Sequence, residues 1–176
     1  ILANFSRLSE VHKAAMQLAS IERNIDVLIH NAGVYLTKRN LTVDNNEEVF
    51  QTNYLSTFIL NYYLREKLKG QKSGRILFVN SEAYRFAAFG IDMNDLIWSN
   101  HKYSGIKSYG AAKMAQLLSM IKFNEYFQGS NITINAMHPG NVRTNSGQSN
   151  GWIYKIFKKK VLDRGAIPLS ISAEAL

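Results

Sequence analysis

Apolar residues recur at helical spacing in three long stretches of the chain. They lie three or four positions apart within residues 7–22, 45–69 and 107–127, which places them on one face of a helix. A short, continuous apolar run follows each stretch, at residues 26–29, 75–79 and 132–136. Apolar runs of this length, bounded by turn residues, are typical of buried strands. The pattern therefore predicts helix and strand in alternation, three times over.

This alternation also predicts how the strands pair. Strands that are buried on both faces and separated by long helices are joined in parallel through crossovers. We therefore expect a doubly wound α/β fold with a parallel sheet, formed by a single domain over residues 1–176. Ligands of such sheets bind beyond the carboxyl ends of the strands. Small or polar residues predominate at those ends, at 30–33, 80–83 and 138–140.

The composition agrees with one packed, globular domain. The 176 residues are 46% hydrophobic and 19% charged, and no apolar run approaches the ~18 residues of a membrane span. We expect a chain that is soluble or bound at a membrane surface, in the cytoplasm or at the membrane periphery. The absence of cysteine excludes disulfides and thiolate metal sites, and the four histidines lack metal-ligand spacing. Because the chain starts at Ile1 and stops where a helix begins, both ends look truncated.

The net charge of +8 raises the question of an anionic partner. Only residues 155–160 form a cluster of basic side chains, and the other Lys and Arg residues are scattered, so we expect no binding of nucleic acid. Basic and aromatic residues interleave over 152–160. We interpret this segment as a helical flap over a substrate cleft, with contact to an anionic membrane surface as the alternative. Whether the chain forms a homo-oligomer is left open.

A tyrosine followed four positions later by a lysine presents both side chains on one helix face. This spacing occurs four times, at Tyr63/Lys67, Tyr103/Lys107, Tyr109/Lys113 and Tyr154/Lys158. The first pair lies toward the opposite edge of the sheet, the second spans a turn-like Ser-Gly sequence, and the fourth falls in the basic segment. The third pair opens the helix that leaves the second loop. The small residues 110–112 would let a flat ligand lie close to the backbone there.

The pair Tyr109/Lys113 is suited to proton transfer near neutral pH. A free phenol has a pKa near ~10, so acting at neutral pH requires a decrease of about three units, or ~4 kcal/mol. A lysine charge ~4–5 Å away, at an effective dielectric constant of ~20, supplies roughly this energy. We therefore predict that Lys113 lowers the pKa of Tyr109, which then gives or takes the proton of a carbonyl compound or an alcohol.

Five motifs follow one another in a characteristic order: residues 30–33, Asn53 within Gln-Thr-Asn-Tyr, Ser81, Tyr109 with Lys113, and Pro-Gly-x-Val-x-Thr at 139–144. In this order they resemble the short-chain dehydrogenase/reductase family, over nearly the whole chain. The resemblance implies a Rossmann-type sheet and a nicotinamide cofactor. It also implies hydride transfer between that cofactor and a small-molecule carbonyl or alcohol substrate.

The resemblance assigns catalytic roles to Asn53, Ser81, Tyr109 and Lys113. Ser81 would hydrogen-bond the substrate oxygen beside Tyr109, Lys113 would also bind the nicotinamide ribose, and Asn53 would hold a water that links Lys113 to solvent. Ser81 as a helix cap and Asn53 as a purely structural amide remain alternatives. The residues that would bind the cofactor are Asn31, Ala32 and Gly33 on the adenosine side, Tyr109 and Lys113, and Pro139, Gly140, Val142 and Thr144 around the nicotinamide.

The long stretch between Ser81 and Tyr109 is similar to the branch of the family with retinol dehydrogenases and protochlorophyllide reductases. That branch implies NADP, with NAD as the alternative, and a lipophilic or bulky substrate. Aromatic and apolar residues form either a wall for such a substrate or ordinary core, namely Tyr84, Phe86, Phe89, Ile91, Met93, Leu96, Ile97 and Trp98. The sequence departs from the family pattern at two positions, where His30 replaces the more usual Asn and Asn80 replaces a common Ser. Both departures look tolerable.

The Gly-rich phosphate loop of the family is missing from this sequence. We expect two βα units, of about 30 residues each, to precede Ile1. Our first hypothesis is an NAD(P)-dependent oxidoreductase that interconverts a carbonyl compound and an alcohol. The alternative, motivated by the missing loop, is a noncatalytic Rossmann-type binding or scaffold protein, or an inactive fragment.

Overall fold

The computed structural model describes residues 1–142, 150–152, 154, 159, 166–168, 170 and 173. Its elements follow in the order α1 (Leu8–Ser20), β1 (Val27–His30), α2 (Glu48–Phe50), the π-helix η1 (Gln51–Leu55), α3 (Ser56–Lys69), β2 (Gly74–Val79), the 3-10 helix η2 (Glu82–Ala87), α4 (Gly105–Tyr126) and β3 (Ile132–Met137). The three predicted helices and three predicted strands are confirmed. Among the described residues, no helix has both the length and the apolar character needed to cross a membrane.

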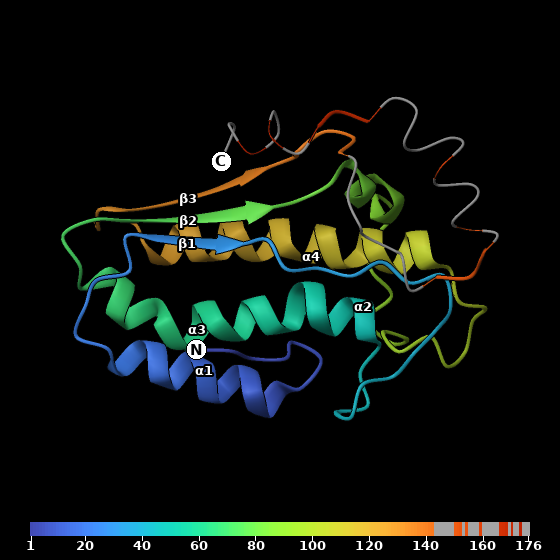
Figure 1. Ribbon diagram of the computed structural model, residues 1–176, viewed down its shortest axis with the longest axis horizontal. Helices are drawn as coiled ribbons and strands as arrows, with labels where there is room; N and C mark the ends of the chain where they lie inside the picture. The colour runs from blue at the N-terminus through green and yellow to red at the C-terminus, as the bar shows by residue number, and fades with distance from the viewer. Residues whose placement is uncertain are drawn as a thin grey trace.

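The strands β1, β2 and β3 form a parallel sheet, as predicted, and they lie in that order across it. His30, Phe78 and Ala136 lie in register on the three strands. All three carboxyl ends therefore reach the same edge of the sheet, on the right in Figure 1. A hydrogen bond from the Asn80 amide to the Met137 carbonyl (2.8 Å) continues the pairing of β2 and β3 beyond this point.

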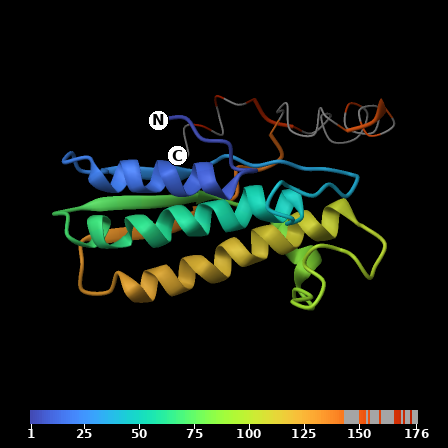
Figure 2. The same ribbon diagram turned by 90° about the horizontal axis from the view of Figure 1, so that it is seen from below.

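The three long helices cover one face of the sheet, where α1, α3 and α4 lie side by side in front of the strands in Figure 2. The main core between the helices and the sheet contains Leu64, Leu68, Ile76, Phe78, Phe123, Phe127, Ile132 and Ile134. On the opposite face, Val27 and Ile29 of β1 are 54% and 45% exposed. The prediction of strands buried on both faces is therefore wrong for β1 within the described residues. Its side chains alternate between the helical layer and an open face.

The second predicted helix consists of three consecutive segments, α2, η1 and α3. It starts at Glu48 rather than at residue 45, because Glu47 caps its first turn. The Glu47 carboxylate accepts hydrogen bonds from the amides of Val49 (3.1 Å) and Phe50 (2.8 Å), which have no partner within the helix. The π-helical turn η1 carries the buried Asn53. Single π-turns of this kind are frequent at functional sites.

Candidate active site

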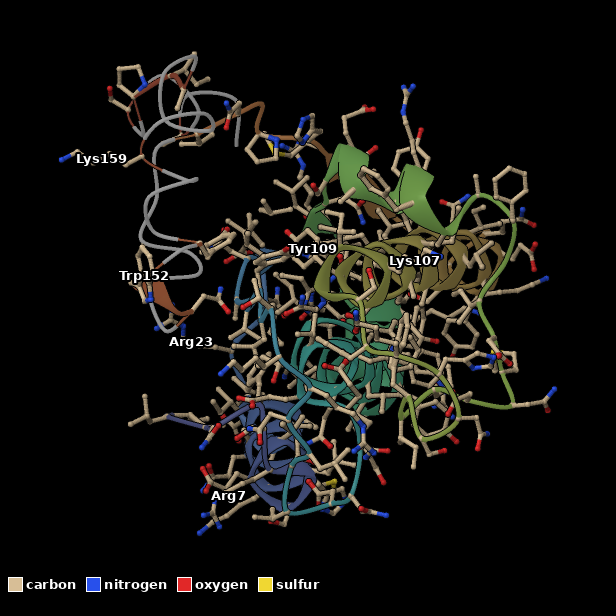
Figure 3. All side chains as sticks on the ribbon, turned by 90° about the vertical axis from the view of Figure 1, so that its right-hand side faces the viewer. Arg7, Arg23, Lys107, Tyr109, Trp152 and Lys159 are labelled. Carbon is tan, nitrogen blue, oxygen red and sulfur yellow. The ribbon has the colours of Figure 1, made fainter. Side chains whose placement is uncertain are left out.

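Tyr109 lies in the second turn of α4, at the edge where the strands end. Figure 3 faces this edge and places Tyr109 near the centre of the molecule. Ser81 lies between β2 and η2 and caps η2, since its hydroxyl accepts a hydrogen bond from the Ala83 amide (3.2 Å). The Ser81 side chain also lies close enough to Tyr109 to lower the pKa of its phenol. Ser81 is thus both a helix cap and a direct neighbour of the phenol.

Lys113 is buried one helical turn beyond Tyr109, and its Nζ atom lies 5.6 Å from the centre of the Tyr109 ring. Nζ donates a hydrogen bond to the carbonyl of Val79 (2.8 Å), the last residue of β2. Burial lowers the pKa of Lys113 to about 8, because the charged form loses hydration. The structure therefore brings Ser81, Tyr109 and Lys113 together, as predicted for a proton-transfer site.

The predicted decrease in the pKa of Tyr109 is wrong for this structure. Burial raises the pKa of the phenol above its ordinary value of 10.0, and the neighbouring Ser81 side chain opposes this only in part. The physical reason is that removal from water penalises the phenolate, while the Lys113 ammonium is directed to the Val79 carbonyl. Tyr109 is consequently held in its protonated form.

Two of the competing Tyr/Lys pairs have structural roles. Tyr103 precedes α4, and its hydroxyl donates to the Glu47 carboxylate (2.9 Å), so it shares no helix face with Lys107. On α3, Tyr63 packs edge-on against His12, with ring centres 4.7 Å apart. Lys67 donates a hydrogen bond to the Ile21 carbonyl. The interpretation of these pairs as structural agrees with their contacts.

Asn53 anchors the loop that follows β1. Its side chain accepts a hydrogen bond from the Val34 amide (2.7 Å) and donates one to the Val34 carbonyl (2.9 Å). Its own backbone carbonyl accepts a hydrogen bond from the Gln116 side chain (2.7 Å). Gln116 in turn contacts Lys113 (3.2 Å), so a side-chain amide connects the Asn53 carbonyl to Lys113. The water that Asn53 would hold between Lys113 and solvent stays a prediction.

The residues predicted to bind the cofactor lie along the same edge. Asn31, Ala32 and Gly33 directly follow β1, and all three are exposed. A Cβ atom at Gly33 would lie 3.2 Å from the Asn53 side-chain oxygen, so this glycine lets the loop pass close to η1. Pro139 and Gly140 follow β3, and Gly140 has the left-handed φ of 80° that favours glycine.

Beyond Gly140, the described chain continues to Val142, which forms a parallel β-bridge with Ile167. Thr144 lies outside the described residues, and its predicted contact with the nicotinamide stays a prediction. Of the segment 152–160, the structure describes Trp152, Tyr154 and Lys159. Trp152 and Lys159 are exposed and lie away from Tyr109 in Figure 3.

The small residues after Tyr109 serve packing within the protein. A Cβ atom at Gly110 would lie 2.5 Å from the Ala83 carbonyl oxygen and 3.1 Å from Cβ of Phe86, both in η2. Ala112 is buried in a cluster with Phe50. The interpretation of residues 110–112 as a flat surface for a ligand is therefore wrong at these two positions. Close contact between α4 and η2 instead brings Tyr109 next to Ser81.

The apolar stretch between η2 and α4 divides into two sets. Ile91 and Leu96 pack against the cluster of Phe50, Ala112 and Ala115 and are therefore core residues. Phe86, Phe89 and Met93 are exposed. Neither of the two interpretations of this stretch thus applies to all of its residues.

Three aromatic rings, those of Tyr109, Tyr35 and Tyr154, lie in contact one after the other. The Tyr35 ring meets the Tyr109 ring edge-on, with centres 5.6 Å apart, and lies 5.4 Å from the Tyr154 ring. Asn150 joins the two segments that carry these rings. Its side-chain amide accepts a hydrogen bond from the Thr37 amide (2.7 Å) and donates one to the Tyr35 carbonyl (2.9 Å).

Three buried polar residues that support the site were not identified from the sequence. Glu47 accepts hydrogen bonds from the hydroxyls of Tyr103 (2.9 Å) and Ser108 (2.7 Å), next to Tyr109. Asn80 and Gln116 hydrogen-bond each other behind Lys113 (3.2 Å). Asn80 could have been identified as a site residue, since it directly follows a predicted strand. Glu47 and Gln116 look like ordinary helical residues in the sequence.

His30 ends β1 as a buried, neutral imidazole. Its Nε2 atom is 2.8 Å from the Asn61 side-chain oxygen, and its ring stacks on Phe78 with centres 4.7 Å apart. Burial lowers the pKa of His30 from 6.5 to about 4, against a smaller opposing effect of the Asn61 hydrogen bond. Between pH 6.5 and pH 4, His30 therefore binds a proton in the unfolded chain but not in the folded chain.

The free energy of unfolding should therefore decrease as the pH is lowered, by about 2 kcal/mol between pH 7 and pH 5 from His30 alone. Urea unfolding at the two pH values measures the change. A His30→Asn variant, which carries no titrating group at this position, should lose about 2 kcal/mol less than the original protein over the same interval. Equal losses in the two proteins would contradict a buried, neutral His30.

The sequence of this chain is similar to those of known proteins. The family profile described as short chain dehydrogenase matches residues 1–92. Retinol dehydrogenase 13 of Homo sapiens is 34% identical over 148 residues, which cover 84% of this chain and 44% of that protein. The chain thus spans less than half the length of this relative.

Solved structures share the same fold. An uncharacterized protein from Mycobacterium paratuberculosis is 32% identical, with a TM-score of 0.68, over 81% of this chain and 50% of the other. A short-chain dehydrogenase from Sphingobium yanoikuyae, solved in complex with NADPH, is 18% identical with a TM-score of 0.66, over 98% of this chain and 60% of the other. The parallel sheet described here is therefore part of a Rossmann-type fold. From the family profile and these similarities, the chain belongs to the short-chain dehydrogenase/reductase family, in the branch that resembles retinol dehydrogenases.

Proposed function

We propose that the protein is an NAD(P)-dependent oxidoreductase that interconverts a carbonyl compound and an alcohol, with Tyr109 as the general acid and base. One observation carries the proposal most strongly. The Ser81 side chain lies close enough to the Tyr109 phenol to act on its pKa, and the buried Lys113 ammonium lies 5.6 Å from the Tyr109 ring, at the carboxyl edge of a parallel sheet. Ligands of such sheets bind at this edge.

The residues along the edge are compatible with a nicotinamide cofactor. Asn31 offers an exposed amide, and Ala32 and Gly33 leave the backbone accessible to a flat group. Lys113 would bind the ribose hydroxyls, and Pro139, Gly140, Val142 and Thr144 would surround the nicotinamide. The cofactor would supply the hydride. We assign NADP, with NAD as the alternative, and the NADPH complex of the Sphingobium yanoikuyae relative supports this assignment.

Each catalytic side chain has a defined task in carbonyl reduction. Ser81 donates a hydrogen bond to the carbonyl oxygen, and Tyr109 gives that oxygen its proton as the hydride arrives. Tyr109 enters the reaction as the protonated phenol. Lys113 places a positive charge next to the phenolate that remains.

The substrate is proposed to be lipophilic or bulky. The Tyr35 ring beside Tyr109, and the Tyr154 ring beyond it, offer a continuous aromatic surface close to the reacting phenol. Such rings can bury large apolar groups. The name of the relative retinol dehydrogenase 13 indicates a long, apolar alcohol as the substrate of that protein.

The decisive measurement is the oxidation of NADPH in the presence of retinaldehyde, with protein expressed from its complete coding sequence. We expect turnover that depends on both reactants, and binding of NADPH in isothermal calorimetry. A protein that binds NADPH without turnover of any aldehyde or ketone would instead be a noncatalytic binding protein. Absence of both binding and turnover would contradict the proposed function altogether.

A further inference from the structure

Gln116, one turn beyond Lys113 on α4, is almost completely buried, with 1% of its surface exposed. Its side-chain nitrogen donates a hydrogen bond to the backbone carbonyl of Asn53 (2.7 Å). Its side-chain oxygen accepts hydrogen bonds from Lys113 Nζ (3.2 Å) and from the Asn80 amide (3.2 Å). Both ends of the amide are thus occupied inside the protein.

These partners determine the orientation of the Gln116 amide. A backbone carbonyl can only accept a hydrogen bond and an ammonium can only donate one, so the oxygen must face Lys113 and the nitrogen must face Asn53. Asn80 is fixed in the same way. Its nitrogen donates to the Lys113 carbonyl (3.0 Å), and its oxygen accepts from the Ser81 amide (2.8 Å).

The network restricts a side chain that is flexible by itself. Lysine has four rotatable methylene groups, and its ammonium can take many positions. Here Nζ is held between the Val79 carbonyl (2.8 Å) and the Gln116 oxygen (3.2 Å). The first acceptor belongs to the end of β2 and the second to α4, so the ammonium is located relative to both elements.

We propose that Gln116 is a positioning residue, which holds the Lys113 ammonium beside Tyr109 and connects it to the carbonyl of Asn53. This inference rests on the proposed function of Tyr109 and Lys113 in proton transfer. Gln116 acts through Lys113 and does not itself contact the reacting atoms. Its length matters, because asparagine is one methylene shorter and could not reach both partners from the same position.

The acid–base behaviour of Lys113 tests the proposal without cofactor or turnover. We suggest ¹³C labelling of lysine Cε and an NMR titration from pH 6 to pH 11, with the Lys113 signal assigned by its loss in a Lys113→Met variant. Gln116→Glu and Gln116→Met both keep the length of the side chain. The first places a carboxylate beside the ammonium and should raise the pKa of Lys113 above its value of about 8. The second removes an acceptor and should lower the pKa further.

Opposite shifts are the expected signature. Damage to packing that admitted water would raise the pKa of Lys113 in both variants, toward the ordinary 10.5. Titrations of both variants that coincide with the original protein would overturn the positioning role. If Gln116→Met failed to fold, Gln116→Leu, which also removes the acceptor without adding a charge, would take its place and should likewise lower the pKa of Lys113.

Kinetics separates this inference from the proposed function. We expect Gln116→Met to lower kcat of retinaldehyde reduction about tenfold, the effect of one hydrogen bond to a charged group, with KM for the aldehyde unchanged. An unchanged kcat would count against the positioning role even where turnover depends on Tyr109. Turnover that did not depend on Tyr109 would contradict the proposed function and leave the titration of Lys113 as the measure of the contact with Gln116.

Discussion

Replacing Tyr109 by phenylalanine should lower kcat of carbonyl reduction by about 10²–10⁴-fold, the range that a positioned proton donor contributes. Only the hydroxyl is removed, so the edge-on contact of the ring with Tyr35 is kept. Affinity for NADPH, measured by calorimetry, should change little. Steady-state oxidation of NADPH with retinaldehyde measures kcat.

Tyr63→Phe is the matched control for this variant. Tyr63 has the same four-residue spacing to a lysine, Lys67, but lies on α3 and packs against His12. Its hydroxyl should be dispensable for turnover. Equal rates for Tyr109→Phe and the original protein would exclude Tyr109 as the proton donor, whereas a comparable loss in Tyr63→Phe would indicate a general effect on folding.

Gly110→Ala should damage both stability and turnover. The new methyl group would lie 2.5 Å from the Ala83 carbonyl oxygen, which belongs to the backbone of η2 and cannot move aside alone. Overpacking of this kind costs about 1–3 kcal/mol. Because Ser81 caps η2, displacement of η2 would also separate Ser81 from Tyr109, and a misplacement of about 1 Å can lower kcat ~10²-fold.

Thermal unfolding and NADPH oxidation measure the two effects of Gly110→Ala. Gly151→Ala is the control, since a Cβ atom at Gly151 would meet no atom of the described residues within 4 Å. This control should retain both the melting temperature and kcat. A Gly110→Ala protein as stable and active as the original would show that α4 and η2 can separate without affecting the site.

The arrangement of helices and strands was predictable because its signal is local. The apolar run at 75–79 and the helical spacing in 107–127 are visible in the sequence alone, and both correspond to elements of the structure within two residues at each end. The exposure of Val27 and Ile29 was not predictable, because apolar residues do not reveal which face a neighbouring layer will cover.

The site was predictable in part, for a similar reason. Ser81, Tyr109 and Lys113 each follow a strand or open a helix, so their common location follows from the topology. The contacts that surround them connect distant positions. Gln116 meets Asn53 across 63 residues, and such a contact produces no periodic pattern. The raised pKa of Tyr109 is likewise an effect of burial, which spacing does not reveal.

Glu47 has a consequence for the order in which the protein folds. Its carboxylate joins the start of α2 to Tyr103 and Ser108, which are 56 and 61 residues away in the sequence. Contacts of such large separation form only after a long loop has closed. We infer that this cap forms its full set of contacts only after the loop between α2 and α4 has closed, whereas α1 and the single turns of α3 can form from neighbouring residues alone.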